Sequence, residues 1–167
     1  AFMKSLQDTT IHFNSQRQWI GERKEGIEQA SSVFHNNQMK IMLKPQIWIH
    51  KGFTGHIEMK TEKEWEVFEE NYAQFLLFYA DIAEEQHIEL LCIGTELNSF
   101  VTQRPQFWNQ LIQRIRKIYK GQLTYAENWD TYQNVPFFNT LDYIGIDAYF
   151  PLANEQTPSI TVKFMDY

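Results

Sequence analysis

The chain has 167 residues, 43% hydrophobic and 16% aromatic, which is enough to bury the core of one domain, and we predict a single domain over 1–167. Its 15 Lys and Arg against 21 Asp and Glu give a net charge of −6 without a long basic block, which argues against a nucleic-acid partner. Because no apolar stretch approaches the roughly 20 residues that cross a bilayer, no membrane span is expected.

The first half of the chain predicts two helices around one strand. A helix is expected from Arg17 or Trp19 to Asn36, followed by a strand over 40–49. Thr61 then opens a long helix through the Thr-x-x-Glu capping box that it forms with Glu64. The apolar face of that helix is predicted to be core and consists of Trp65, Phe68, Tyr72, Phe75, Leu76, Tyr79 and Ala83.

The second half predicts three further strands with helical connections. The strand over 88–94 contains Cys92, the one cysteine, which is interpreted as an ordinary buried thiol. Pro105 suits the first turn of the next helix, which continues to Ile118. The remaining elements are a strand over 122–128, a short helix or turn over 136–140 and a strand over 141–150.

Strands that alternate with helices indicate a parallel α/β architecture. A doubly wound sheet would usually show a phosphate-binding glycine loop, yet neither GxGxxG nor GxxxxGK[ST] occurs. A (β/α) TIM-type barrel places its chemistry at the carboxyl ends of its strands but needs eight of them. We therefore predict an incomplete barrel with about strands 3 to 6, a partial strand over 1–6, and no clear helix in the tail after 150.

The predicted strands end on acids, amides and aromatic rings, in the segments KPQIW, GTELNS, YAENWD and DAYFP. Glu96 follows an aliphatic strand, so partial desolvation should raise its pKa toward that of a general acid. Glycoside cleavage needs such an acid together with a second carboxylate. Within this chain the candidates for the second group are Glu127, Asp130 and Asp147.

Aromatic side chains at the strand ends suit sugar rings, whose C–H faces stack on flat surfaces. Trp48, Trp129, Tyr149 and Phe150 fall at such positions. Tyr149 lies two residues after Asp147, so both should share one side of the sheet, facing either the barrel mouth or the helices.

Other catalytic chemistries lack their motifs. The five histidines form no HExxH or HxH arrangement, so no metal site is predicted, although His50 and His56 could contact a ligand from their loop. There is no GxSxG elbow and no plausible cysteine nucleophile.

Taken in order, MLKPQIWI, LLCIGTELNSF, RPQFWNQLIQRIRKIY, LTYAENWD and LDYIGIDAYFPL resemble the glycoside hydrolase family 113 β-mannanases and related barrel glycosidases of the same clan. The resemblance covers roughly residues 40 to 152. It implies an eight-stranded (β/α) barrel and retaining hydrolysis of β-1,4-mannosidic linkages in an oligosaccharide or polysaccharide, without a metal or organic cofactor. It assigns the acid/base to Glu96, at the end of the fourth strand. The nucleophile of the family follows the seventh strand, beyond this chain, so the isolated segment is expected to be inactive.

The resemblance also implies a set of substrate-binding positions. From the resemblance come Asn128, Trp129, Asp130 and Tyr149, and the pattern of strand-end residues adds Trp48, Thr95, Asn98 and Asp147 to the predicted substrate-binding residues. Thr95 stands where the clan commonly has Asn, and Gln46 where the family often has His, so substrate identity is less constrained than fold.

A second hypothesis is a barrel-derived module that binds carbohydrate, or assembles with a partner, without cleaving it. A location outside the cytoplasm, secreted or periplasmic, is the expectation for a polysaccharide hydrolase. The sequence leaves the compartment, the oligomeric state, the linkage cleaved and endo against exo action open.

Overall fold

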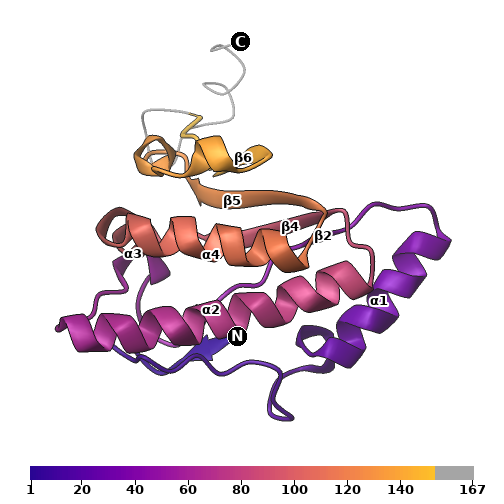
Figure 1. Cartoon of the computed structure of the whole chain (residues 1–167), viewed down its shortest axis with the longest axis horizontal. Coiled ribbons are helices and arrows are strands. Elements are labelled where there is room, and N and C mark those ends of the chain that lie inside the picture. The colour runs from indigo at the N-terminus through magenta and orange to yellow at the C-terminus, as the bar shows by residue number, and fades with distance from the viewer. Residues whose placement is uncertain (153–167) are drawn as a thin grey trace.

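The computed structural model describes residues 1–152 and shows parallel strands connected by helices (Figure 1). The strands are β1 (Phe2–Met3), β2 (Met42–Leu43), β3 (Trp48–Ile49), β4 (Leu90–Thr95), β5 (Gln122–Asn128) and β6 (Tyr143–Asp147). The α-helices are α1 (Lys24–Asn36), α2 (Glu62–Glu85), α3 (Asn98–Gln103) and α4 (Pro105–Ile118). Short 3₁₀ turns are η1 (Ile20–Glu22), η2 (Thr54–His56), η3 (Tyr132–Asn134) and η4 (Phe138–Thr140).

The strands follow one another in space as they do in the chain. A two-stranded parallel sheet pairs β1 with β3, and a four-stranded parallel sheet has the order β2-β4-β5-β6. Since β2 and β3 are successive pieces of one stretch, the described strands run from β1 to β6 without the order reversal of a doubly wound sheet. This arrangement confirms the prediction of a parallel α/β fold of the barrel type that is incomplete.

The strand predicted over 40–49 is the largest difference from the sequence expectation. It is split into β2 and β3, which pair with β4 and β1 respectively. Pro45 lies in the gap, and a proline offers no N–H to a strand ladder. Other bounds differ as well: α1 begins only at Lys24, the strand predicted over 88–94 spans Leu90–Thr95, and β6 spans Tyr143–Asp147, so that Tyr149 follows the strand rather than lying in it. Helix α3 is not predicted from the sequence.

Helix α2 forms as the sequence predicts. The hydroxyl of Thr61 accepts a hydrogen bond from the Glu64 backbone N–H (3.2 Å), and Glu64 Oε2 accepts one from the Thr61 N–H (2.9 Å). The capping box thus satisfies donors that a helix start leaves free. The predicted apolar face of α2 is buried along its whole length.

The core lies between the helices and one face of the main sheet, and it is dominated by aromatic rings. In Figure 1, α2 and α4 run alongside each other, with α4 between α2 and β5 in this view. Trp108 of α4 stacks on Phe137 with ring centroids 5.1 Å apart and meets Phe100 of α3 at the same separation. Phe100 in turn stacks on Trp65 of α2 at 5.5 Å. Rings in these arrangements add to the stabilisation from apolar burial.

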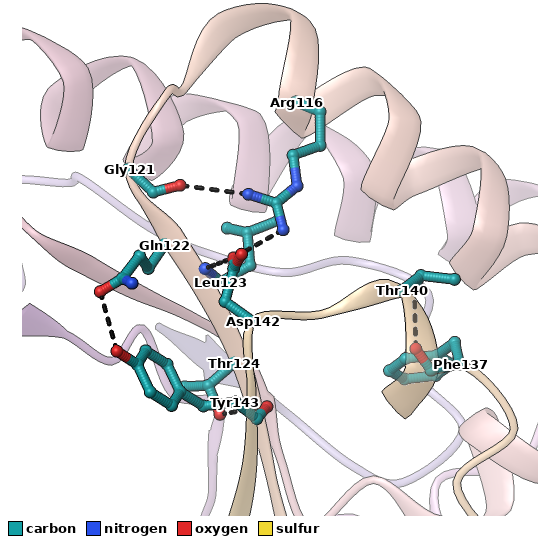
Figure 2. A network of polar contacts seen from close by, with 9 residues as sticks. All are labelled: Arg116, Gly121, Gln122, Leu123, Thr124, Phe137, Thr140, Asp142 and Tyr143. Atoms are coloured by element: carbon teal, nitrogen blue, oxygen red, sulfur yellow. Dashed lines mark hydrogen bonds and ion pairs between the residues drawn. The ribbon is translucent and has the colours of Figure 1, made fainter.

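The start of β6 is fastened to α4 and β5 by a polar network (Figure 2). The Asp142 carboxylate accepts hydrogen bonds from Arg116 Nη2 (2.6 Å) and from the Leu123 backbone N–H (2.7 Å). Tyr143 donates from its hydroxyl to Gln122 Oε1 at 3.2 Å. The network fixes the end of β6 opposite to the one that carries Asp147.

Two further sequence expectations concern burial and length. Cys92 is a buried free thiol, as predicted. Within residues 1–152, no helix is both long enough and apolar enough to cross a membrane. The tail for which no helix is predicted lies, from residue 153 onward, outside the described residues.

Candidate active site

Three neighbouring strands bring their carboxyl ends, and the polar residues there, to one edge of the sheet. β4 ends at Thr95, β5 at Asn128 and β6 at Asp147, and the register sets Asn128 opposite Asp147. Glu96 follows Thr95 directly, and its backbone N–H donates to the Ala126 carbonyl at 2.8 Å. The prediction that these strand ends share one rim is therefore confirmed for β4, β5 and β6.

Glu96 occupies a strained turn that its neighbours hold in place. Its φ of +51° lies in the left-handed region, which costs a residue with a side chain roughly 1–2 kcal/mol. The next N–H, that of Leu97, donates to the hydroxyl of Tyr125 at 2.8 Å. Gly94 lets this packing occur, because a Cβ there would lie 2.8 Å from the Tyr125 ring. These contacts hold the turn at Glu96 directly after β4.

The environment of Glu96 favours its protonated form. Partial burial raises the pKa of this carboxyl group above its ordinary value, and the negative charges of Asp147 and Glu127 raise it further. The positive charge of Lys44 acts on the pKa in the opposite direction. Within residues 1–152 no Lys or Arg forms an ion pair with Glu96 that would fix it as a carboxylate. A raised pKa brings a carboxyl group closer to the range in which it can act as a general acid.

Glu127 is held by the protein itself on both of its oxygens. It is fully buried, and Oε2 accepts a hydrogen bond from the Tyr125 hydroxyl at 3.0 Å. Oε1 accepts from the Asn128 backbone N–H (3.0 Å) and from the Thr131 hydroxyl (3.2 Å). Burial raises the pKa of Glu127 as well. These contacts favour a supporting role, through Tyr125, over that of a second reacting carboxylate.

Asp147 forms an ion pair that the sequence analysis does not anticipate. Lys44 Nζ lies 3.1 Å from Oδ1 and 3.3 Å from Oδ2 of Asp147. The two side chains are 25% and 22% exposed, so solvent screens them only in part. The sequence feature that could have indicated a role for Lys44 is its place directly after the apolar residues IML of a predicted strand.

Buried polar atoms without a partner flank Glu96. In the part of the chain that the structure describes, Thr95 Oγ1 and Asn98 Nδ2 are enclosed and make no hydrogen bond. Unsatisfied polar atoms are uncommon in protein interiors and call for an explanation. Both residues lie within two positions of Glu96 in the chain.

The predicted aromatic residues are distributed over two regions. Tyr149 is 78% exposed beyond β6, and the partly buried ring of Trp129 lies 5.7 Å from that of Phe150. Trp48 is 69% exposed but belongs to the β1–β3 pair rather than to the main sheet. It lines a cavity of about 600 Å³ that Lys44 also borders and that Glu96 does not reach. Asp130 is exposed after β5.

The acids of the rim are not arranged for a metal. Among residues 1–152, no three His, Cys, Asp or Glu side chains come close enough together to hold an ion.

Comparisons with known proteins agree with this geometry. The family model of Glycoside Hydrolase Family 113 matches residues 1–164. The structure of the GH113 β-mannanase AaManA from Alicyclobacillus acidocaldarius, in complex with ManMIm, superimposes with a TM-score of 0.84 at 25% identity, covering 90% of this chain and 49% of that one. A GH113 β-1,4-mannanase structure gives 0.82 at 25% identity over 90% and 50% of the two chains.

A complex of a GH113 β-1,4-mannanase also shares the fold, with a TM-score of 0.82 at 24% identity over 92% of this chain and 50% of that one. No curated protein matches the sequence. The chain spans about half the length of the mannanase structures that it matches. Since the family match extends over nearly all of its residues, the chain belongs to glycoside hydrolase family 113.

Proposed function

We propose that this chain supplies the general acid/base, Glu96, of a retaining glycoside hydrolase that acts on β-1,4-mannan or a related β-linked polysaccharide. The observation that carries the proposal is a partly buried glutamate, with a raised pKa, at the shared rim of three parallel strands. Membership of family 113 and the likeness to β-mannanase structures support the reaction class and the substrate.

In this mechanism Glu96 acts twice. Protonated, it donates to the glycosidic oxygen as the bond to the anomeric carbon breaks, while a second carboxylate attacks that carbon and forms a glycosyl-enzyme intermediate. Ionised, it then takes a proton from the water that releases the sugar. The family resemblance puts the attacking carboxylate after a seventh strand, beyond this chain, so we expect the isolated segment to hydrolyse nothing.

The remaining rim residues are proposed to bind the sugar rings. Tyr149 offers an exposed ring for stacking after β6, and Trp129 follows β5 at the same edge of the sheet. Away from this rim, Trp48 of the β1–β3 pair offers another exposed ring. The buried unpaired atoms of Thr95 and Asn98 are suited to sugar hydroxyl groups, as are the polar side chains of Asn128, Asp130 and Asp147.

The test of the acid/base assignment compares Glu96→Gln with the unsubstituted enzyme, in a protein extended to the full length of its relatives. We expect the rate of hydrolysis of mannan-type oligosaccharides to fall by about 10²–10⁴-fold, because an amide cannot donate a proton at that step. The matched control is Glu66→Gln, an exposed glutamate on α2 that should leave the rate unchanged. Equal rates for Glu96→Gln and the unsubstituted enzyme would remove Glu96 from the mechanism.

Two further measurements test the finer statements. Proton NMR during hydrolysis should show the β-anomer of the product first, whereas initial release of the α-anomer would mean inversion. Binding of mannan oligosaccharides by the full-length protein without any cleavage would favour instead a non-catalytic carbohydrate-binding module.

A further inference from the structure

We propose that Lys44 and Asp147 act as positioning residues that control when Glu96 carries its proton. The inference rests on the proposed function, because it assigns a task to two residues around the proposed acid/base. Neither residue needs to touch the glycosidic bond for this task.

The geometry of the sheet puts the pair beside Glu96. Lys44 directly follows β2 and Asp147 ends β6, and these are the two outer strands of the order β2-β4-β5-β6. Lys44 and Asp147 are 103 residues apart in sequence, and the Lys44 ammonium contacts both oxygens of the Asp147 carboxylate. Because β4 and β5 lie between β2 and β6, this contact spans the carboxyl ends of β4 and β5. Glu96 leaves the end of β4 and is bonded through its backbone to β5, within this bridge.

The groups around Glu96 come from each strand of the main sheet. Asp147 approaches from β6, Glu127 from β5 and Lys44 from the end of β2. The Cys92 thiol of β4 is buried, and burial raises its pKa, so it contributes no competing negative charge. Glu127 is held by its own hydrogen bonds, and the other two charges that act on Glu96, those of Lys44 and Asp147, are paired with each other.

The two members of the pair act on Glu96 with opposite signs. The carboxylate of Asp147 repels a second negative charge and so favours protonated Glu96, whereas the ammonium of Lys44 favours the carboxylate form. Because Lys44 contacts both oxygens of Asp147, it also fixes the position from which that carboxylate acts. Partial burial of both side chains makes these effects larger than those of a solvent-exposed pair.

The experiment is the pH dependence of kcat/KM for the full-length enzyme on a mannan oligosaccharide. The alkaline limb of this profile reports loss of the proton from the general acid. Asp147→Asn removes a negative charge, lowers the pKa of Glu96 and should move the alkaline limb to lower pH by about one unit. Lys44→Met removes a positive charge and should move the same limb to higher pH. The double variant should lie between the two single variants.

Two control variants make the same substitutions, Lys to Met and Asp to Asn, at positions on α2. Lys63→Met and Asp81→Asn lie on the exposed face of α2 and should leave the alkaline limb where it is. Should a variant be too slow for kinetics, ¹³C NMR titration of the Glu96 side-chain carboxyl group measures the same shift directly.

The outcomes separate this inference from the proposed function. Opposite shifts for Asp147→Asn and Lys44→Met support the pair as the regulator of Glu96, since loss of fold would change rates without moving the limb in opposite directions. Shifts in the same direction, or none, overturn the inference, and Glu96→Gln still decides separately whether Glu96 is the acid/base.

Discussion

The side of β4 and β5 that faces the helices and the carboxyl ends of the same strands contribute differently to the protein. On the helix side, Tyr125 packs edge-on against Trp108 at 5.5 Å, and Leu123, two residues earlier on the same face, is fully buried. At the carboxyl ends of the same strands, Glu96 keeps a raised pKa and Thr95 keeps a buried hydroxyl without a partner among the described residues. Among the described residues each region keeps a buried polar atom without a partner, Trp108 Nε1 on the helix side and Thr95 Oγ1 at the rim, and the regions differ in that only the rim carries the carboxyl group of Glu96 with its raised pKa.

This difference shows how the same strands separate stability from chemistry. A rim with unsatisfied polar atoms and a strained glutamate costs folding free energy, which the aromatic core must offset. Tyr125 links the two regions, because its ring lies in the core while its hydroxyl contacts Leu97 and Glu127 at the rim. Substitutions in the core, at the link and at an exposed ring should therefore have effects of decreasing size on stability.

The largest effect on stability is expected for Trp108→Ala in the core. The indole is completely buried among the rings of Tyr72, Phe100, Tyr125 and Phe137. Its removal should lower the free energy of unfolding by about 3–5 kcal/mol, measured by urea denaturation. Trp19→Ala, at a tryptophan that is 75% exposed, is the matched control and should change the value by less than about 0.5 kcal/mol. Equal losses at both tryptophans would contradict the location of the core.

An intermediate effect is expected for Tyr125→Phe at the link. The change keeps the ring but leaves the Leu97 N–H and Glu127 Oε2 without this partner. We expect a loss of about 1–3 kcal/mol of unfolding free energy and, because Leu97 follows Glu96, a lower kcat in the full-length enzyme. Tyr143→Phe, which removes an exposed hydroxyl, should change stability by less than about 0.5 kcal/mol. A Tyr125→Phe protein with unchanged stability and kcat would show that the hydroxyl does not support the turn.

The smallest effect on stability is expected for Trp48→Ala on the exposed surface of β3. Because this ring is mostly exposed, its removal should change the unfolding free energy by less than about 0.5 kcal/mol. Loss of a stacking surface worth about 0.5–1.5 kcal/mol should instead raise KM for mannan oligosaccharides several-fold in the full-length enzyme. A large loss of stability with an unchanged KM would assign Trp48 to packing.

Features set by neighbouring residues could be predicted from the sequence. The capping box of Thr61 and Glu64, the buried stripe of α2 and the bounds of β5 follow from short-range hydrogen bonds and from side-chain periodicity. The same holds for the place of Glu96 after an apolar strand, since parallel strands present their carboxyl ends on one side. Pro45 is a local signal against one continuous strand over 40–49, but which strands the two pieces join, β4 and β1, depends on the tertiary structure.

The sequence was sufficient to indicate the parallel architecture and the position of the candidate acid, because both follow from interactions within a few residues. Only the tertiary structure decided which charges surround that acid. In the folded chain Glu127 is buried and accepts a hydrogen bond from the Tyr125 hydroxyl, and Lys44 contacts Asp147, which is 103 residues away in sequence. The physical reason is that electrostatic effects depend on distance and burial in space, which are set by strand order and register and not by separation along the chain.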